Sequence, residues 1–367
     1  MRIGLVIYGS LDTLSGGCLY DRMLDEHLRR QGDEVEIISL PWRDYARHLS
    51  DNLSSGLLHR LQRSRLDVLL QDELNHPSLF WLNGRLRGAH LAQESAGYPL
   101  AAIVHHLRSS EQHPAWQKVL YRWVERRYLQ GVDGFIFNSQ TTRQTVAEMS
   151  INLEKTPFTI AYPAGNRMHP DVQDADIIRR NQQAGQLRLL FLGNLIPRKG
   201  LHTLLDALSR LPGEAWQLTV IGSPEMDKAY VRAIQRQVTR LHIDGRVAFC
   251  GPLGEAELAG QMAASHILAI PSSYEGFGIA YLEGMGFGLP AIATTGGGAG
   301  EIITHGVNGF LLPPGDPLAL TNCLSMLMNN RQQLLEMSLA ARRRYLTHPT
   351  WEDTGRRIRE FLHRLVM

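Results

Sequence analysis

The chain has 367 residues, of which 44% are hydrophobic and 20% are charged, as expected for a folded globular protein of about two domains. Its formal net charge of +2 excludes the strong overall basicity that would favour nucleic acid, so no nucleic-acid partner is expected. The three cysteines are widely spaced, which excludes a disulfide framework and a cysteine-based zinc site and indicates free thiols in a reducing, cytoplasmic compartment.

The first half of the chain alternates short apolar runs with longer amphipathic segments. The run at residues 3–8 is too short for the apolar core of a signal peptide and is expected to be a buried strand, followed by a helix over residues 17–31. No apolar stretch approaches the ~18 residues that a membrane span needs. Further strands are expected at residues 34–40, 67–71, 100–106 and 134–139. Continuous apolar strands separated by helices are typical of parallel sheets built from βαβ units.

The chain changes character between residues 169 and 186, where it is polar, charged and without an apolar stripe. We interpret residues 171–186 as an interdomain linker with room for a short helix. The acidic pair Asp174 and Asp176 lies in this stretch and not at the end of a strand, so it is expected to start a helix. No metal is therefore expected to be required.

A second alternating series begins at residue 187. Its expected strands are residues 187–193, 216–222, 246–251, 266–272, 289–294 and 309–313. Its expected helices are residues 200–211, 227–241, 254–265 and 279–287, with an amphipathic helix at the C-terminus. The sequence thus predicts an α/β protein with two doubly wound domains, residues 1–170 and 187–349, and residues 350–367 packing back on the first. Ligands of such sheets bind beyond the carboxyl ends of the strands, so we expect the site in a cleft between the domains.

Two glycine-rich turns of the second domain join a strand to a helix. Arg198 and Lys199 lie in the first, just before the helix, where free N–H groups and the helix dipole favour a phosphate. The second turn places Glu275 before a helix and Glu283 eight residues later, at most ~12 Å away along the axis. Taken alone, the first turn could be a solvated basic turn and Glu283 an exposed glutamate. Together they fit a polyhydroxy ligand with phosphates between its ends, as in a nucleotide sugar.

Three motifs of the C-terminal half, "GNLIPRKG", "EGFGIAYLEGMGFGLP" and "GGGAGEIITHGVNGFL", resemble those of the retaining glycosyltransferases of family 4, the glycosyl transferases group 1. The N-terminal half matches more loosely, through "SGG", "IVHH" and "FNS". The resemblance implies the GT-B fold, which has two Rossmann-like domains and a cleft between them.

The resemblance also implies roles for individual residues. Glu275 would hold hydroxyls of the transferred sugar, Glu283 the ribose hydroxyls, and Lys199 the diphosphate. His105 would lie near the reacting sugar, with His106 as the alternative. The family usually has arginine at the position of Asn194, and Arg198 is the candidate to supply that charge. The remaining donor-binding positions are Gly16, Gly17, Phe249, Gly251, Leu253, Gly276, Phe277, Gly278 and Ile279.

The predicted reaction is retaining transfer of a sugar from a nucleoside diphosphate sugar to an acceptor hydroxyl of a sugar, lipid or small metabolite, in cell-envelope, exopolysaccharide or glycolipid synthesis. No cofactor is expected. Two alternatives stay open at this point, a nucleotide-sugar epimerase and a non-catalytic nucleotide-sugar-binding subunit. The donor base, the sugar and the acceptor are not specified by these motifs.

Residues 115–129 mix four aromatic with four basic side chains. One interpretation is a basic amphipathic helix that lies on an anionic membrane, which would make the protein peripheral at the inner face. In the other, Trp116, Leu120, Trp123 and Arg127 form an ordinary stripe that faces the core.

Overall fold

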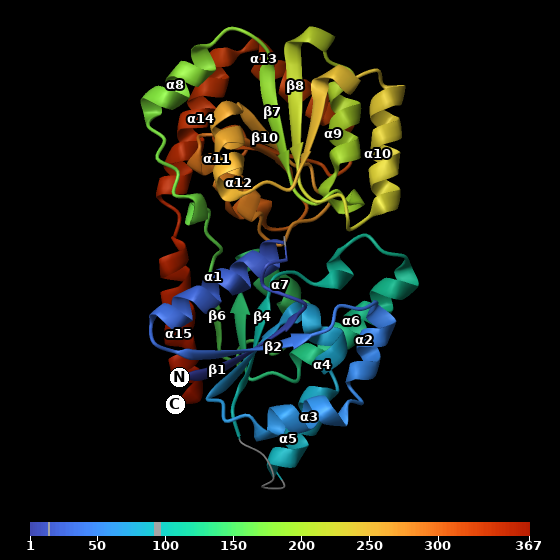
Figure 1. The fold of residues 1–367 in the computed structure, drawn as a ribbon, viewed down its shortest axis with the longest axis vertical. Coiled ribbons are helices and arrows are strands. Elements are labelled where there is room, and N and C mark those ends of the chain that lie inside the picture. Colours follow the sequence, from blue (N-terminus) through green and yellow to red (C-terminus); the bar gives the residue numbers. More distant parts are fainter. Residues whose placement is uncertain (14, 92–96) are drawn as a thin grey trace. The chain divides into compact units, whose positions relative to one another are not determined.

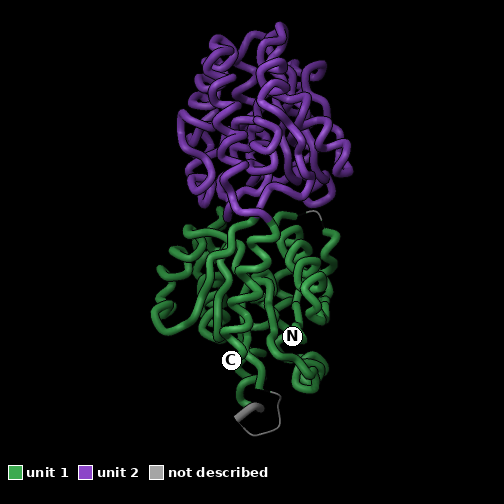
Figure 2. The backbone as a smooth tube through the Cα atoms, turned by 90° about the vertical axis from the view of Figure 1, so that its left-hand side faces the viewer, with its two compact units in different colours: residues 1–163, 351–367 green, residues 164–350 purple. Residues whose placement is uncertain are grey.

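The computed structural model describes residues 1–13, 15–91 and 97–367, which divide into two compact units (Figure 2). Unit 1 comprises residues 1–163 and 351–367, and unit 2 comprises residues 164–350. Each unit contains a six-stranded parallel sheet with helices packed against it. The two-domain α/β fold that the sequence predicts is therefore confirmed. None of the described helices combines the length and the apolar character that crossing a membrane requires.

The sheet of unit 1 has the strand order β2-β1-β3-β4-β5-β6 (Figure 1). Its strands are β1 (Arg2–Tyr8), β2 (Glu34–Leu40), β3 (Val68–Asp72), β4 (Leu100–Val104), β5 (Gly134–Phe137) and β6 (Phe158–Ile160). The helices are α1 (Gly16–Arg30), α2 (Tyr45–Asp51), α3 (Ser55–Arg63), α4 (His76–Leu79), α5 (Leu82–Leu91), α6 (Ala115–Leu129), α7 (Gln140–Ala147) and α15 (Trp351–Val366). Strands β3, β4 and β5 are buried along their whole length, which explains their continuous apolar sequences.

Helix α15 packs on α1 within unit 1, and the contact joins the two ends of the chain. Trp351 lies edge-on to Tyr20 at 5.7 Å between ring centroids, and Thr354 donates a hydrogen bond to the carbonyl of Tyr162. Arg359 donates to Asp33, which also accepts from the N-terminal amine. The last helix is thus held in unit 1 by apolar, neutral and charged contacts.

The sheet of unit 2 has the order β12-β11-β10-β7-β8-β9. Its strands are β7 (Leu187–Leu192), β8 (Trp216–Ile221), β9 (Val247–Gly251), β10 (Ile267–Ala269), β11 (Ala291–Thr294) and β12 (Gly309–Leu312). The helices are α8 (Asp174–Gln182), α9 (Leu201–Leu208), α10 (Lys228–Arg240), α11 (Glu255–Ala264), α12 (Ile279–Gly286), α13 (Pro317–Asn329) and α14 (Arg331–Leu346). Helices α9 and α10 lie on one side of this sheet, and α11, α12 and α14 lie on the other (Figure 1).

The stretch interpreted as a linker contains helix α8, which packs on α14 inside unit 2. Ile177 is fully buried, and Arg180 donates hydrogen bonds to the carbonyls of Phe287 and Gly288. The apolar stripe escapes notice in the sequence because Ile177 and Ile178 are its only large aliphatic residues. Hydrogen bonds from the buried Arg180 to the turn after α12 hold the helix in addition.

Candidate functional site

Lys199 and Glu275 are bonded to each other in unit 2. Nζ of Lys199 donates to Oε1 of Glu275 over 2.6 Å, and the hydroxyl of Ser272 donates to the same oxygen over 2.6 Å. Arg198 approaches Oε2 of Glu275 at 3.6 Å and donates to the carbonyl of Tyr274 at 2.7 Å. The structure therefore brings three of the predicted site residues into one charged cluster.

The fold explains why these residues meet. From β7 the chain proceeds through β8 and β9 on one side and then returns to place β10 on the other side, so the strand order reverses between β7 and β10. Such a switch point is where open α/β sheets bind their ligands. Arg198 and Lys199 follow β7, and Glu275 follows β10. The cluster thus lies at the switch point of unit 2.

Two glycines permit the close approach of the loops around Glu275. Gly200 has a φ of +73°, and a Cβ atom there would lie 2.1 Å from the carbonyl oxygen of Pro271. Gly297 has a φ of +94°, and a Cβ atom there would lie 1.9 Å from the carbonyl oxygen of Glu275. Side chains at either position would push the turns apart. The third sequence motif therefore acts as a support for the Glu275 loop.

The charges of the cluster stabilise one another. Burial raises the pKa of Glu275, but the charges of Lys199 and Arg198 outweigh it and hold this pKa at about 2. Burial lowers the pKa of Lys199, and the pairing with Glu275 opposes that effect. Glu275 is 8% exposed, so it is an ionised carboxylate with little access to water. A polar ligand that enters here meets fixed charges of both signs.

Residues 276–278 lead from Glu275 into α12. Phe277 is buried, Gly278 precedes the first helical residue with a φ of +100°, and Ile279 begins the helix. Glu283 lies in the next turn, is 3% exposed and forms an ion pair with Arg167. Arg167 also donates to Glu255 at 3.2 Å. Burial raises the pKa of Glu283, whereas the charge of Arg167 lowers it.

Sequence reasoning missed two partners in this region. Ser272 is the last residue of the strand predicted over residues 266–272. A polar residue at the end of an apolar strand could have been recognised as a candidate site residue. Arg167 lies on the short η3 turn (Asn166–Met168), in the stretch assigned to the first domain. Nothing in the sequence connects it with Glu283, 116 positions away.

The remaining predicted residues of unit 2 lie along the same edge of the sheet. The amide of Asn194, just after β7, contacts Sδ of Met226 at 3.0 Å. Phe249 is 43% exposed on β9, and Gly251 ends that strand with a φ of +68°. Strand β8 lies between β7 and β9 in the sheet. The segment from Phe249 to Leu253 therefore lies two strands away from β7 and outside the Lys199–Glu275 cluster.

Gly17 and His105 meet in unit 1. Gly16 and Gly17 begin α1, and an ideal Cβ atom on Gly17 would lie 3.3 Å from Cδ2 of His105. The His105 carbonyl accepts hydrogen bonds from Asn138 and Thr142. The glycine turn and the histidine predicted from the family thus form one local site. His106 points elsewhere and contacts Glu111 through Nε2 at 3.1 Å.

Two aspartates that the sequence reasoning missed adjoin His105. Asp21 on α1 is 0% exposed and its Oδ1 lies 3.4 Å from Nε2 of His105. Asp72, the last residue of β3, is 2% exposed and accepts a hydrogen bond from the amide of Leu74. Both could have been recognised in the sequence as candidate site residues. Asp72 ends an apolar strand, and Asp21 lies on the same face of α1 as the buried Leu24 and Leu28.

Two groups in the described parts of the chain bring metal-ligand atoms within 4.8 Å of one another, Asp21 with Asp72 and His105, and Glu73 with His76 and Glu125. In the second group both ring nitrogens of His76 already have partners, the Glu73 carbonyl and the Tyr45 hydroxyl. In the first, an ion pair between the imidazole and a carboxylate explains the arrangement. We assign a metal to neither group.

Comparisons with known proteins identify the family of the chain. The family model described as glycosyl transferases group 1 matches residues 173–344, and that of the glycosyl transferase 4-like domain matches residues 18–157. The D-rhamnosyltransferase WbpZ of Pseudomonas aeruginosa is 28% identical over 303 residues, which cover 78% of this chain and 77% of that protein.

Two solved structures share the fold over almost the whole chain. A sucrose-phosphate synthase from Thermosynechococcus elongatus has a TM-score of 0.82 at 20% identity, with 99% of this chain and 98% of that chain covered. HepE of Anabaena, solved in complex with UDP and glucose, has a TM-score of 0.76 at 21% identity, with 99% of each chain covered. The chain belongs to the group 1, family 4 type glycosyltransferases of GT-B fold.

Proposed function

We propose that this glycosyltransferase moves a sugar from a nucleoside diphosphate sugar to an acceptor hydroxyl with retention of the anomeric configuration. The observation that carries the proposal is the contact of Lys199 with Glu275 at the switch point of unit 2, with Arg198 beside them. It puts a cation for the diphosphate directly beside a carboxylate for the sugar hydroxyls. The complex of the structural relative HepE with UDP and glucose supports this class of donor.

The donor would extend from Glu275 toward Glu283. Glu275, with the backbone of Gly276, Phe277 and Gly278, would hold the transferred sugar, and the N-terminus of α12 would face the diphosphate. Glu283 would accept hydrogen bonds from the ribose hydroxyls, and the charge of Arg167 beside it favours the ionised carboxylate. The base would lie along the segment from Phe249 to Leu253, where backbone groups frame it.

Charge development explains the chemistry. The bond between the anomeric carbon and the leaving phosphate oxygen breaks, and negative charge grows on the diphosphate. Lys199, Arg198 and the N-termini of α9 and α12 would stabilise that charge without reorganisation. The acceptor oxygen forms its bond to the anomeric carbon on the same face, and its proton passes to the leaving phosphate. No protein nucleophile is needed, and we propose that no metal ion is required because these cations supply the positive charge.

The acceptor is proposed to lie at a membrane surface. The stripe of α6 that could have faced the core faces outward, because Trp116 is 68% exposed, Leu120 is 39% exposed and Trp123 is 60% exposed. The opposite face of α6 is buried through Tyr121, Val124, Glu125, Tyr128 and Leu129. Four exposed basic residues accompany the exposed stripe, Lys118, Arg122, Arg126 and Arg127. Aromatic side chains with basic neighbours suit the interface of an anionic membrane, so we propose a glycolipid or lipid-linked saccharide acceptor in envelope or exopolysaccharide synthesis.

The decisive experiment has two stages. Thermal unfolding in the presence of UDP, GDP, ADP and their sugars ranks the donors, because a ligand of the native state raises the melting temperature. The best donor is then incubated with lipid extracts and saccharide acceptors, with and without EDTA. NMR of the product gives the anomeric configuration. We expect retained configuration and the same rate in the presence of EDTA.

The same experiment separates the alternatives. A new nucleotide sugar formed from the donor alone would identify an epimerase. Donor binding without turnover across the acceptor panel would favour a binding subunit. Inverted configuration in the product would exclude the proposed mechanism.

A further inference from the structure

Asp21, Asp72 and His105 come from three segments that converge at the carboxyl edge of the unit 1 sheet. The order β2-β1-β3-β4 reverses between β1 and β3, so this edge contains the switch point of unit 1. Asp21 lies in the second turn of α1, which follows β1, Asp72 ends β3, and His105 follows β4. The cluster therefore occupies the place in unit 1 that the Lys199–Glu275 cluster occupies in unit 2.

The carboxylate of Asp21 lacks the hydrogen-bond donors that other aspartates of unit 1 have. Both of its carboxylate oxygens are buried and neither accepts a hydrogen bond from a described residue. Its close cationic neighbour is the ring of His105, at 3.4 Å. A buried carboxylate without hydrogen-bond donors is costly unless an adjacent charge compensates it. The burial of Asp21 is thus explained if His105 is an imidazolium.

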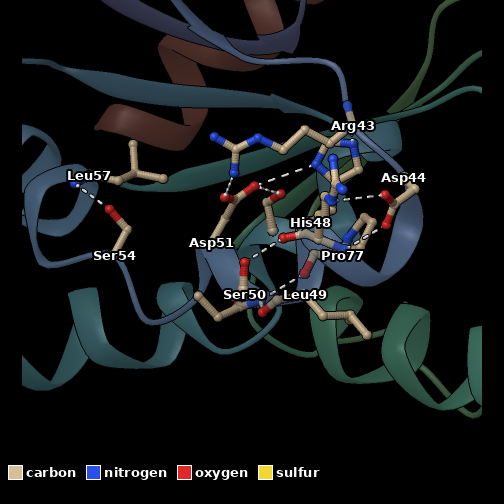
Figure 3. A network of polar contacts seen from close by, with 12 residues as sticks. Arg43, Asp44, His48, Leu49, Ser50, Asp51, Ser54, Leu57 and Pro77 are labelled. Atoms are coloured by element: carbon tan, nitrogen blue, oxygen red, sulfur yellow. Dashed lines mark hydrogen bonds and ion pairs between the residues drawn. The ribbon is translucent and has the colours of Figure 1, made fainter.

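A second histidine–aspartate pair of unit 1 shows the contrast (Figure 3). Nδ1 of His48 lies 3.4 Å from Asp51, the same separation as in the Asp21 pair. Asp51, however, also accepts hydrogen bonds from Arg43 at 3.0 Å and from Ser78 at 2.8 Å. Because other donors satisfy it, Asp51 does not need a charged histidine. The histidine–aspartate distance is the same in the two pairs. Only the Asp21 carboxylate, however, depends on a charged imidazole ring for compensation.

The surroundings of His105 fix the charge of the cluster. The titratable groups that face it are Tyr20 and Asp21 on α1, Asp72 on β3 and Glu73 on η1 (Glu73–Asn75), and Cys18 adjoins the two aspartates. Burial lowers the pKa of His105, but Asp21 and Asp72 outweigh it and raise that pKa. Burial and the charge of Asp21 raise the pKa of Asp72 to about 7. The adjoining carboxyl groups of Asp21 and Asp72 therefore favour the charged form of the His105 ring.

We propose that Asp21, supported by Asp72, is a positioning residue that holds the His105 ring under the Gly16–Gly17 turn as a cation, paired with the Asp21 carboxylate over 3.4 Å. The proposal rests on the proposed function and on the expectation, from the family resemblance, that Gly16 and Gly17 bind the donor. An imidazolium held beneath this turn adds a fixed positive charge to this surface. Tyr20 limits rotation of the ring from the other side, edge-on at 5.1 Å between centroids.

The test replaces Asp21 by Asn, which keeps the shape and removes the charge. The His105 pKa is measured by NMR of histidine-labelled protein, with the signal assigned from a His105→Gln variant. We expect the pKa to fall by at least about 1 in Asp21→Asn. The matched control, Asp51→Asn, removes the other aspartate that lies 3.4 Å from a histidine and should leave the His105 pKa unchanged. An unchanged His105 pKa in folded Asp21→Asn overturns the proposal.

Kinetics supply a second readout. The cationic ring is lost as pH rises through its pKa, so Asp21→Asn should shift the basic limb of kcat/KM to lower pH. The kcat should fall about tenfold with the donor KM nearly constant, and Asp21→Glu should recover part of it. If Asp21→Asn does not fold, Asp72→Asn carries the same test, with a smaller fall in the His105 pKa. A lack of transfer with every donor would count against the proposed function alone, because the NMR titration needs no substrate.

Discussion

Nζ of Lys199 donates a 2.6 Å hydrogen bond to Oε1 of Glu275. The residue predicted to neutralise the diphosphate and the residue predicted to hold the transferred sugar are therefore direct neighbours. In a nucleoside diphosphate sugar the β-phosphate is bonded to the anomeric carbon, so a site for this ligand needs a cation and a hydroxyl acceptor side by side. The pairing also favours the charged form of each side chain.

Replacement of Lys199 by Ala should lower kcat at least about 100-fold, because the growing charge on the leaving diphosphate loses its closest cation. Lys199→Arg keeps the charge and should recover part of the rate. The control is Lys228→Ala, which removes an exposed lysine paired with Glu225 at 3.2 Å and should change kcat less than twofold. Initial rates with the best donor measure all three. A near-normal rate in Lys199→Ala would refute its role.

The stability of unit 2 should depend on pH through Glu275. Its pKa is about 2 in the folded chain, against an ordinary value of 4.5, so ionisation favours the folded state. The contribution, at most about 3 kcal/mol, is complete above pH 4.5 and is lost as pH falls toward 2. The melting temperatures of wild type and Glu275→Gln should therefore differ most at neutral pH, differ by about half as much at pH 3, and converge only near pH 2. A constant difference between pH 7 and pH 3 would contradict this assignment.

The sequence predicts the parallel sheets well because their strands are continuous apolar runs, as in β3 and β4, and because glycine turns punctuate the second half. It does not reveal β6 (Phe158–Ile160), a three-residue edge strand with one buried position. Nor does it separate α13 from α14, which follow one another with no strand between them. Such elements depend on tertiary contacts and not on a local period.

For the candidate site, motif spacing identifies Lys199, Glu275 and Glu283, because each lies on a loop or helix that follows a recognisable strand. It does not find Arg167, which meets Glu283 only through the fold. The orientation of α6 was undecided in the sequence, since an aromatic stripe can face either a core or a membrane surface. Burial of the Tyr121 face decides it.

Glu283→Gln should weaken donor binding and leave the chemical step almost intact. Glu283 is proposed to accept hydrogen bonds from the ribose, which is remote from the bond that breaks, so the donor KM and the Kd of the free nucleotide should rise about tenfold. Calorimetry with the nucleotide and initial rates measure the two effects. Glu255→Gln removes the other, 56% exposed partner of Arg167 and serves as the control. A large fall in kcat with unchanged KM would place Glu283 at the reacting centre instead.

The exposed face of α6 should bind anionic vesicles. Wild-type protein is expected to sediment with vesicles of phosphatidylcholine and phosphatidylglycerol more than with phosphatidylcholine alone, and less at high salt. Replacing Trp116 and Trp123 by Ser should abolish binding to both. Reversing two charges one turn apart, in Lys118→Glu with Arg122→Glu, should weaken anionic binding at least about tenfold.

The matched control for these α6 variants is Arg232→Glu with Arg236→Glu. It makes the same change in net charge, at the same spacing, on the exposed face of α10 in unit 2. If binding requires the α6 surface, this control sediments like the wild type, because its arginines belong to a helix with no exposed tryptophan. Equal loss in the control would show that vesicles respond only to net charge. An absence of wild-type binding to anionic vesicles would remove the membrane from the proposed function and leave soluble saccharides and small metabolites as acceptors.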